Sequence, residues 1–293
     1  MQIPDQFNFI RWLKDESVAL VNDDQGKKIV IKECGKGKIL EQFSDTAKEF
    51  TRVLRGVMPE LYSAGNFLCH TYVEGQIAGD TTENFGLTRF AMQKINPQIL
   101  AEAIFELQNI SRADFVAQAP LERRKSSWYL KNLEETKEAI TKEYDLFFYE
   151  SIDQFIRKNG RIIDDNSNVL VNGDLHPQNL FINCLLGGAA KEFAISDWDL
   201  LHINNPGYDL ADLKVWSWQE SAWFESVLEK ALELWKQNNI DINVFVNFNS
   251  VYLSCQMIKH VHLMREKNIG EEALVNANGL LGKSREILNK LIV

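Results

Sequence analysis

VNGDLHPQNLFI at residues 171–182, FAISDWD at 193–199 and NPGYDLADL at 205–213 carry most of the structural information in this sequence. In the first stretch, Asp174 stands five residues before Asn179 in a polar loop between two apolar runs. In the second, Asp197 follows directly on a short apolar run that is typical of a strand. We therefore expect all three side chains in loops that strands hold in place.

These residue types are the ones that phosphoryl transfer requires. The reaction needs metal ions that bridge the nucleotide phosphates, a group that positions the attacking hydroxyl, and a cation on the phosphate oxygens. An aspartate in a loop, such as Asp174, can accept the proton of that hydroxyl. Asn179 and Asp197 offer the hard oxygen ligands that suit Mg²⁺.

Before these motifs, the residues up to about 75 are predicted to be β-rich with one helix. The runs SVALV and KKIVIKE flank the turn-forming cluster NDDQG (22–26), which predicts an antiparallel hairpin. The apolar positions of residues 44–54 fit one face of a helix. Residues 62–75 predict a further strand or strand pair that closes at Gly75.

From about residue 95 the apolar spacing becomes helical. Amphipathic patterns predict successive helices at 99–108, 127–140 and 149–158, and later stripes predict two more at about 224–235 and 243–264. The motif region interrupts this pattern with strands, and LLGGAAKE is typical of a hairpin tip. No internal repeat or long linker divides the chain.

Composition narrows the class of protein. The 293 residues are 45% hydrophobic, and 32 basic against 41 acidic side chains give a net charge of −9, whereas nucleic-acid binders are usually basic. The four cysteines are far apart, which favours isolated thiols in a reducing compartment. Without an apolar run of about 20 residues or a signal-peptide pattern, we expect a soluble cytoplasmic protein with neither nucleic-acid nor membrane partners.

The ordered motifs resemble the aminoglycoside phosphotransferase and choline kinase superfamily, which is similar in fold to protein kinases. The resemblance implies an α+β bilobal protein-kinase-like fold. A small β-rich N-terminal nucleotide-binding lobe would span residues 1–75, and a larger, mainly helical catalytic and substrate-binding lobe would span 76–293. ATP with Mg²⁺ would bind between them.

By position in these motifs, the resemblance assigns roles to five acidic or amide side chains. Asp174 matches the catalytic base, Asn179 a metal ligand and Asp197 the principal metal ligand. Asp199 matches an acid that would contact a second metal or the substrate. Asp209 matches an acid that braces the catalytic loop.

The N-terminal matches are less specific. Lys32 ends an apolar strand, where a kinase-like lysine would reach the α- and β-phosphates, with Glu49 as its helix partner. Lys32 could instead be a solvated edge-strand lysine. Glu49 could instead reach back to the helix start, since it follows Thr46 at capping-box spacing, which leaves Glu41 as a rival partner.

The hinge between the lobes matches YVEG after NFLCHT. Adenine would then bond to backbone groups of Thr71 and Val73, with His70 just before the hinge. The phosphate loop matches KDESVALV, which has no glycine, so backbone amides and the Ser17 hydroxyl would meet the phosphates.

Other departures from the family pattern leave rival functions open. Asn172 stands where a histidine usually precedes Gly-Asp; it can still donate a hydrogen bond but does not titrate near neutrality. This residue and the glycine-free loop motivate a pseudokinase or nucleotide-binding scaffold without turnover. The segment from Asp199 to Asp209 is too short for the activation segment of a protein kinase. It favours a small-molecule acceptor over a kinase that acts on a protein.

The acceptor itself stays open among aminoglycosides, choline or ethanolamine, thiamine, and related amino-alcohols or sugars. Aromatic residues near the third motif, Tyr208, Trp216, Trp218 and Trp223, either cage a quaternary ammonium group by cation–π attraction or belong to the core. The acidic net charge is compatible with a cationic acceptor, although solubility explains it equally well.

The histidines are expected to serve structure. His176, next to Pro177, is predicted to shape the catalytic loop. His202 is expected to be a loop residue, with substrate contact as the alternative. His262 falls on an apolar helical stripe and is expected to pack against the core.

Overall fold

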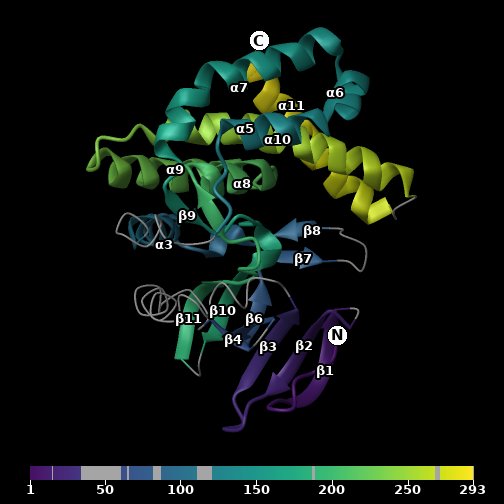
Figure 1. Cartoon of the computed structure of the whole chain (residues 1–293), viewed down its shortest axis with the longest axis vertical. Coiled ribbons are helices and arrows are strands. Elements are labelled where there is room, and N and C mark those ends of the chain that lie inside the picture. The colour runs from purple at the N-terminus through teal and green to yellow at the C-terminus, as the bar shows by residue number, and fades with distance from the viewer. Residues whose placement is uncertain are drawn as a thin grey trace.

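The computed structural model describes residues 1–14, 16–33, 61–64, 66–81, 87–110, 121–186, 189–267 and 271–292. Its strand-rich N-terminal part and its helical C-terminal part lie at opposite ends of the long axis (Figure 1). The predicted α+β bilobal arrangement is therefore confirmed. The helix predicted at residues 44–54, with Glu49, and the alternative partner Glu41 lie outside the described residues.

The N-terminal part is a five-stranded antiparallel sheet in the order β1-β2-β3-β5-β4. Its strands are β1 (Asn8–Lys14), β2 (Val18–Asn22), β3 (Lys28–Glu33), β4 (Leu61–Ala64) and β5 (Phe67–Thr71). The predicted hairpin is β2–β3, whose turn is closed because Asp23 Oδ1 accepts hydrogen bonds from the backbone of Gln25 (3.0 Å) and Lys27 (2.8 Å). The register sets Lys32 opposite Val18, at the far end of this hairpin.

The next strand leaves this sheet and joins a second one. β6 (Val73–Ile77) pairs with β10 (Leu180–Leu186), and β10 pairs with β11 (Ala189–Ile195). The strand predicted to close at Gly75 thus continues to Ile77. The domain boundary at residue 75 remains a prediction and falls within β6. Two short paired strands follow, β7 (Gly79–Thr81) and β8 (Leu87–Phe90), and then the 3₁₀ turn η1 (Met92–Lys94).

The C-terminal helices largely follow the predicted ones. They are α3 (Pro97–Ile110), α5 (Ser126–Glu134), α6 (Lys137–Glu143), α7 (Leu146–Asn166), α8 (Tyr208–Trp216), α9 (Ser221–Lys236), α10 (Ile242–Glu266) and α11 (Glu271–Ile292). The pattern at 127–140 predicted one helix, but two form. The chain turns at Thr136, whose backbone and hydroxyl both donate to the carbonyl of Leu133 (2.8 Å each).

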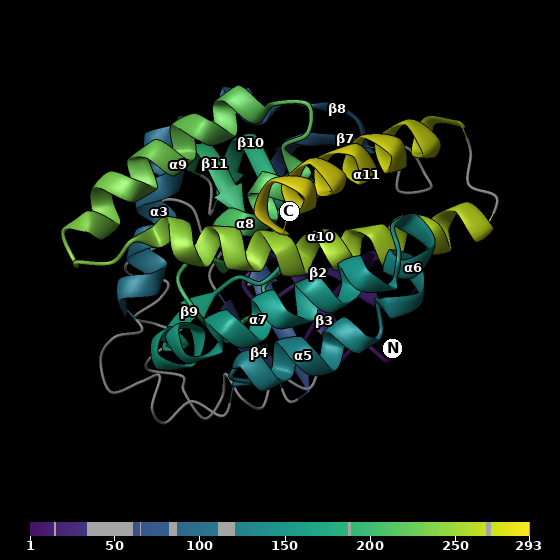
Figure 2. The ribbon, with the colours of Figure 1, turned by 90° about the horizontal axis from the view of Figure 1, so that it is seen from above.

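Helices α10 and α11 run side by side across the top of the molecule (Figure 2). None of the helices within the described ranges is both long enough and apolar enough to cross a bilayer. The cysteines that the structure describes, Cys69, Cys184 and Cys255, are buried and form no disulfide among the described residues, as expected for isolated core residues.

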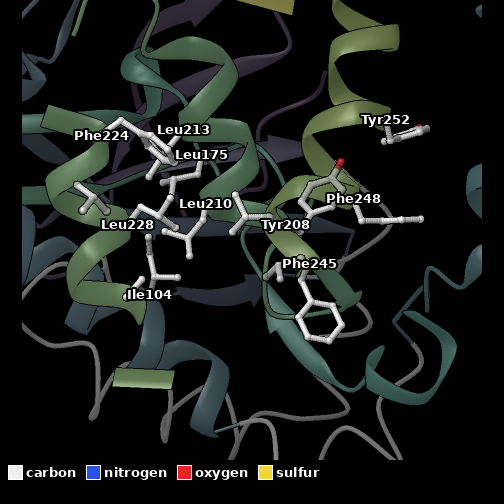
Figure 3. Packing of buried hydrophobic residues seen from close by; sticks show 14 of the residues in the cluster. Ile104, Leu175, Tyr208, Leu210, Leu213, Phe224, Leu228, Phe245, Phe248 and Tyr252 are labelled. Atoms are coloured by element: carbon white, nitrogen blue, oxygen red, sulfur yellow. The ribbon is translucent and has the colours of Figure 1, made fainter. Parts of the chain in front are cut away.

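Helix α8 is the centre of the larger core. Its side chains from Tyr208 to Leu213 are all buried. Figure 3 shows Leu210 and Leu213 beside Leu175, which follows Asp174, with Phe224, Leu228 and Ile104 packed around them. A fully buried leucine stabilises the fold by about 1.5–3 kcal/mol. This packing fixes α8 directly behind the loop that carries Asp174.

The start of α8 gives a stability test, because Gly207 touches the backbone of α10. A Cβ at Gly207 would lie 2.4 Å from the carbonyl carbon of Phe245, whereas a Cβ at Gly282 in α11 would meet nothing within 4 Å. We expect Gly207→Ala to lower the free energy of unfolding by at least about 2 kcal/mol, because backbone cannot move away cheaply. Gly282→Ala should raise it by about 0.5–1 kcal/mol. Urea denaturation measures both, and equal effects would refute the close packing of α8 on α10.

Candidate active site

The loop that carries Asp174 is held from behind by a buried carboxylate. It runs from the end of β9 (Val169–Val171) to the 3₁₀ turn η2 (Pro177–Asn179) and into β10. Asp209, fully buried in the first turn of α8, accepts hydrogen bonds from the backbone N–H groups of Asn172 and Gly173 (3.0 Å each). The bracing contact expected of Asp209 is therefore present. It fixes the two residues that immediately precede Asp174.

Gly173 is needed where this loop passes close to the next strand. Its φ of +88° is in the left-handed region, and a Cβ there would lie 2.5 Å from the carbonyl oxygen of Leu200. The same Cβ would lie 2.7 Å from Nδ1 of His202. The sequence predicted that His202 is a loop residue, and this prediction is wrong. His202 is buried in β12 (His202–Asn204), which pairs with β9.

Amide side chains tie the two acidic loops together. Nδ2 of Asn179 donates to the backbone carbonyl oxygen of Asp174 (2.8 Å) and to its Oδ2 (3.1 Å). The backbone oxygen of Asn179 accepts from the backbone N–H of Ser196 (2.8 Å), next to Asp197. Asn172 donates through Nδ2 to the backbone oxygen of Asp197 (3.3 Å), so the residue that replaces a histidine keeps a donor role. The loops of Asp174 and Asp197 are therefore one hydrogen-bonded unit.

Histidine 176 shapes the same loop. It caps η2, and its Nδ1 accepts from the backbone N–H of Gln178 (3.2 Å), while its ring lies 5.0 Å from that of Trp216. Pro177 occupies the first turn of η2. These contacts agree with the loop-shaping roles expected of both residues. His262 is half-buried on α10 and lies 3.2 Å from Oε2 of Glu143, so it meets a carboxylate at the edge of the core.

Lys32 crosses from the N-terminal sheet to the acidic loop. Its Nζ lies 3.3 Å from Oδ1 of Asp197 and 2.6 Å from Oδ2 of Asp199. Strand β3 lies between β2 and β5, so Lys32 is not on an edge strand and the edge-lysine alternative fails. Its pairing with Glu49 stays a prediction. The structure thus brings Lys32 to Asp197 and Asp199, two acids that lie far from the lysine in the sequence.

The acidic pair suits a bound cation. Burial, followed by the hydrogen bond and negative charge of Asp199, raises the pKa of Asp197 to about 6, and Lys32 offsets this only in part. Among the described residues no group of three or more histidine, cysteine, aspartate or glutamate side chains could hold a metal. Two carboxylates and the amide of Asn179 nevertheless fit Mg²⁺, which usually takes one or two carboxylates and completes its shell with water and phosphate oxygens.

The predicted hinge lies where the chain passes between the two sheets. Thr71 ends β5 and Val73 begins β6, and the backbone N–H of the intervening Tyr72 donates to the carbonyl of Lys28 (3.0 Å). Nδ1 of His70 lies 3.0 Å from the backbone oxygen of Thr71. Burial lowers the pKa of His70, which favours its neutral form. Adenine binding by Thr71 and Val73 stays a prediction.

The predicted phosphate loop is the turn between β1 and β2. Ser17 is exposed there, just before β2 begins. Its contact with phosphate also stays a prediction.

A pocket of about 490 Å³ opens beside Asp174 on the helical side. Aromatic rings form much of its wall and polar side chains stand among them: Arg124, Trp128, Asn132, Gly173, Asp174, Leu200, Tyr208, Asp212, Val215, Trp216, Tyr252, Leu253, Gln256, Met257, Lys259, His260 and Leu263. A molecule in this pocket would lie against the carboxylate of the predicted base. The pocket is therefore the candidate acceptor site.

The predicted aromatic cluster divides between this pocket and the core. Tyr208 and Trp216 line the pocket. Trp223 is buried and donates to a backbone carbonyl, and Trp218 donates to an asparagine of α11. Glu220, which lies between these tryptophans in the sequence, accepts from two backbone N–H groups of η1. Only half of the proposed cage residues thus face the acceptor site.

Arg124, Trp128 and Tyr252 line the pocket but were not predicted. Trp128 and Tyr252 stand on amphipathic helices, where an aromatic residue gives the same pattern whether it faces a core or a pocket. Arg124 precedes α5 in a run of charged residues. No local pattern in the sequence distinguishes it from a surface arginine.

Residues 2–237 match the model of the phosphotransferase enzyme family called APH. The chain belongs to this family. None of the curated proteins matches this phosphotransferase-family chain in sequence.

Solved structures share the fold of this phosphotransferase-family chain at low identity. Choline kinase LicA from Streptococcus pneumoniae is 14% identical, with a TM-score of 0.56 over 96% of this chain and 93% of that one. The APH(2″)-IIa structure with gentamicin is 13% identical, with a TM-score of 0.57 over 97% and 93%. Amicoumacin kinase hAmiN, in complex with AMP-PNP, Ca²⁺ and Ami, is 15% identical, with a TM-score of 0.58 over 98% and 89%.

The brace at Asp209 predicts a pH-dependent stability. Burial raises the pKa of Asp209 from its ordinary 3.8 to about 6, against the two backbone hydrogen bonds that lower it. The native state therefore binds a proton at Asp209 more tightly than the unfolded state does. This proton binding stabilises the fold at low pH, and its contribution to the free energy of unfolding is lost as the pH rises from about 4 to about 6. Asp209→Asn removes this titration and leaves one backbone N–H without its acceptor.

We expect the wild type to be more stable than Asp209→Asn throughout this range. The gap in unfolding free energy should shrink by on the order of 2 kcal/mol between about pH 4 and about pH 6.5. Urea denaturation of both proteins at each pH measures it. A gap that stays constant or widens with pH would contradict the buried, proton-binding state of Asp209.

Proposed function

We propose that this chain is an ATP-dependent phosphotransferase that transfers the γ-phosphoryl group to a hydroxyl of a small molecule. The observation that carries the proposal is the position of Asp174. Its carboxylate accepts a hydrogen bond from Asn179 and lines a pocket large enough for a small molecule. The loop that carries Asp174 is hydrogen-bonded to the backbone of Asp197 through Asn172. Membership of the phosphotransferase family supports this reaction.

Asp174 acts as the base in the proposed reaction. The acceptor hydroxyl oxygen forms a bond to the γ-phosphorus while the bond from that phosphorus to the β,γ-bridging oxygen breaks, and ADP leaves. The proton of the hydroxyl passes to Asp174. Nδ2 of Asn179 donates to Oδ2 of that carboxylate (3.1 Å), and Nε2 of His176 lies 3.5 Å from the same oxygen, so two side chains of the loop orient the base.

The nucleotide would bind beside Lys32. Asn179, Asp197 and Asp199 would hold Mg²⁺, which when bound offsets the phosphate charge. Lys32, which contacts Asp197 and Asp199 in this structure, would contact the phosphates, with Glu49 as its predicted partner. Ser17, Thr71 and Val73 would meet the phosphates and adenine. The AMP-PNP and Ca²⁺ in the amicoumacin kinase structure support this use of the fold.

The segment after Asp199 supports a small-molecule acceptor over a protein. It folds at once into β12, which pairs with β9, and then into α8. The family resemblance suggests aminoglycosides, choline or ethanolamine, thiamine and related amino-alcohols or sugars as the first acceptors to assay. The buried free cysteines support action in the reducing cytoplasm.

The first test replaces the proposed base. We expect Asp174→Asn to lower kcat by about 10²–10⁴-fold, because the hydroxyl loses its proton acceptor, while ATP affinity changes little. A coupled assay of ADP formation against a panel of hydroxylated metabolites and aminoglycosides measures turnover, and calorimetry measures ATP binding. Asp165→Asn, on an exposed stretch of α7, is the matched control.

Three outcomes of these measurements would count against the proposal. Wild-type turnover by Asp174→Asn would remove Asp174 from its role. ATP-induced thermal stabilisation of the wild type with no turnover on any acceptor would favour the pseudokinase, and phosphorylation of peptides alone would favour a protein kinase.

The second test concerns the metal ligands. Asp197→Ala should weaken binding of Mg·ATP by about tenfold or more, since the principal carboxylate is lost. Binding of ATP with EDTA present should change far less. Calorimetry with and without Mg²⁺ measures the difference, and an unchanged Mg²⁺ dependence in the variant would count against the metal assignment.

A further inference from the structure

Arg124 occupies the part of the acceptor pocket where an ammonium cage was expected. Its guanidinium carbon lies 4.1 Å from the ring centroid of Trp128 and 5.6 Å from that of Tyr208. Nη1 donates to the hydroxyl of Tyr208 (3.1 Å), and only 13% of the side chain is exposed. Two of the aromatic rings that line the pocket, those of Trp128 and Tyr208, thus already face a cation of the protein.

The guanidinium is fixed in this position. Its Nε donates to Oε2 of Glu122 (3.0 Å). The backbone N–H of Arg124 donates to the carbonyl of Ile203 (3.0 Å), and its carbonyl accepts from Ser167 Oγ (2.9 Å). Within the described part of the chain, Nη2 has no hydrogen-bond partner. Arg124 is therefore a preorganised donor with unused hydrogen-bonding capacity.

The acidic side chains that line the pocket already accept hydrogen bonds from other residues of the protein. Asp174 is bonded to Asn179, and Asp212 is buried with hydrogen bonds from the backbone of Leu175 and the side chain of Trp216. These are the only acids among the described residues that line the pocket. Lys259 adds a second cation at the wall and pairs with Glu135 (2.8 Å), which is not a lining residue.

We propose that the acceptor carries an anionic group, a carboxylate or a phosphate ester, that binds Arg124 while its hydroxyl lies at Asp174. A guanidinium presents a planar fork of donors that matches the oxygens of either group and forms short charge-assisted hydrogen bonds. The aromatic walls then cover the apolar part of the molecule. This inference rests on the proposed phosphotransferase function and specifies its substrate class.

The same geometry disfavours a quaternary ammonium acceptor such as choline. At Trp128 and Tyr208 its cation would meet rings that the guanidinium of Arg124 already faces, and the two like charges would repel in a partly desolvated site. The acidic net charge of the whole chain does not reverse this. An acceptor in the pocket interacts mainly with the charged side chains that line the pocket, not with the net charge of the chain.

The test compares acceptors that differ only in charge. ω-Hydroxy carboxylates of graded chain length are assayed against their amides and against alcohols that carry a trimethylammonium group in place of the carboxylate. We expect kcat/KM for the best carboxylate to exceed that of its amide by about tenfold or more, with the ammonium alcohols the poorest. In Arg124→Met this ratio should fall toward one, and Arg161→Met, at an exposed position on α7, should keep it.

A binding measurement separates this inference from the phosphotransferase proposal. Calorimetry with Asp174→Asn protein reports carboxylate binding without turnover, and the added Arg124→Met change should weaken it about tenfold or more. Arg124→Lys, which keeps the charge but not the fork, should bind with intermediate affinity, and it replaces Arg124→Met if that variant fails to fold. Equal or better use of amides or ammonium alcohols, or carboxylate binding that ignores Arg124, would overturn the inference.

The two proposals fail in different ways. Absence of Asp174-dependent ADP formation with every acceptor would refute the phosphotransferase. Arg124-dependent carboxylate binding would still support the anionic ligand in that case.

Discussion

The buried carboxylate of Asp209 is the constraint on which the site depends. A charge without solvent is costly unless it is hydrogen-bonded, and its partners here are the backbone N–H groups of Asn172 and Gly173. The helix that carries Asp209 is itself locked by its leucines in the core. The loop that carries Asp174 therefore derives its position from the packing of α8, and Asn179 orients the side chain of Asp174.

The sequence predicted this region well because its chemistry is local. Asp174 and Asn179 are five residues apart in one loop, and Asp197 follows its own strand. The types of these residues and their spacing were therefore enough to predict how they lie. The fold class followed from the same motifs and from the change in apolar period after the N-terminal strands. The contact of Lys32 with Asp197 joins distant residues, and family resemblance rather than spacing placed them in one site.

The acceptor pocket could not be predicted in the same way. Arg124, Tyr208 and Tyr252 come from segments far apart in the chain, and an aromatic residue on an amphipathic helix packs a core or lines a pocket with the same periodicity. His202 was misplaced for a related reason. The strand that contains it is only three residues long and exists because β9 is there to pair with it.

The pairing of β6 with β10 determines which parts of the site can move relative to each other. The segment from Val73 pairs with the strand that follows Asn179, so Val73, one of the two residues predicted to contact adenine, and the loop of Asp174 are joined to one sheet. Lys32 belongs to the other sheet. A rotation about the peptide near Tyr72 would thus change the distance from Lys32 to Asp197 while the proposed base kept its alignment. Such a rotation would separate the lysine from the acids and leave the hydrogen bonds between the loops of Asp174 and Asp197 in place.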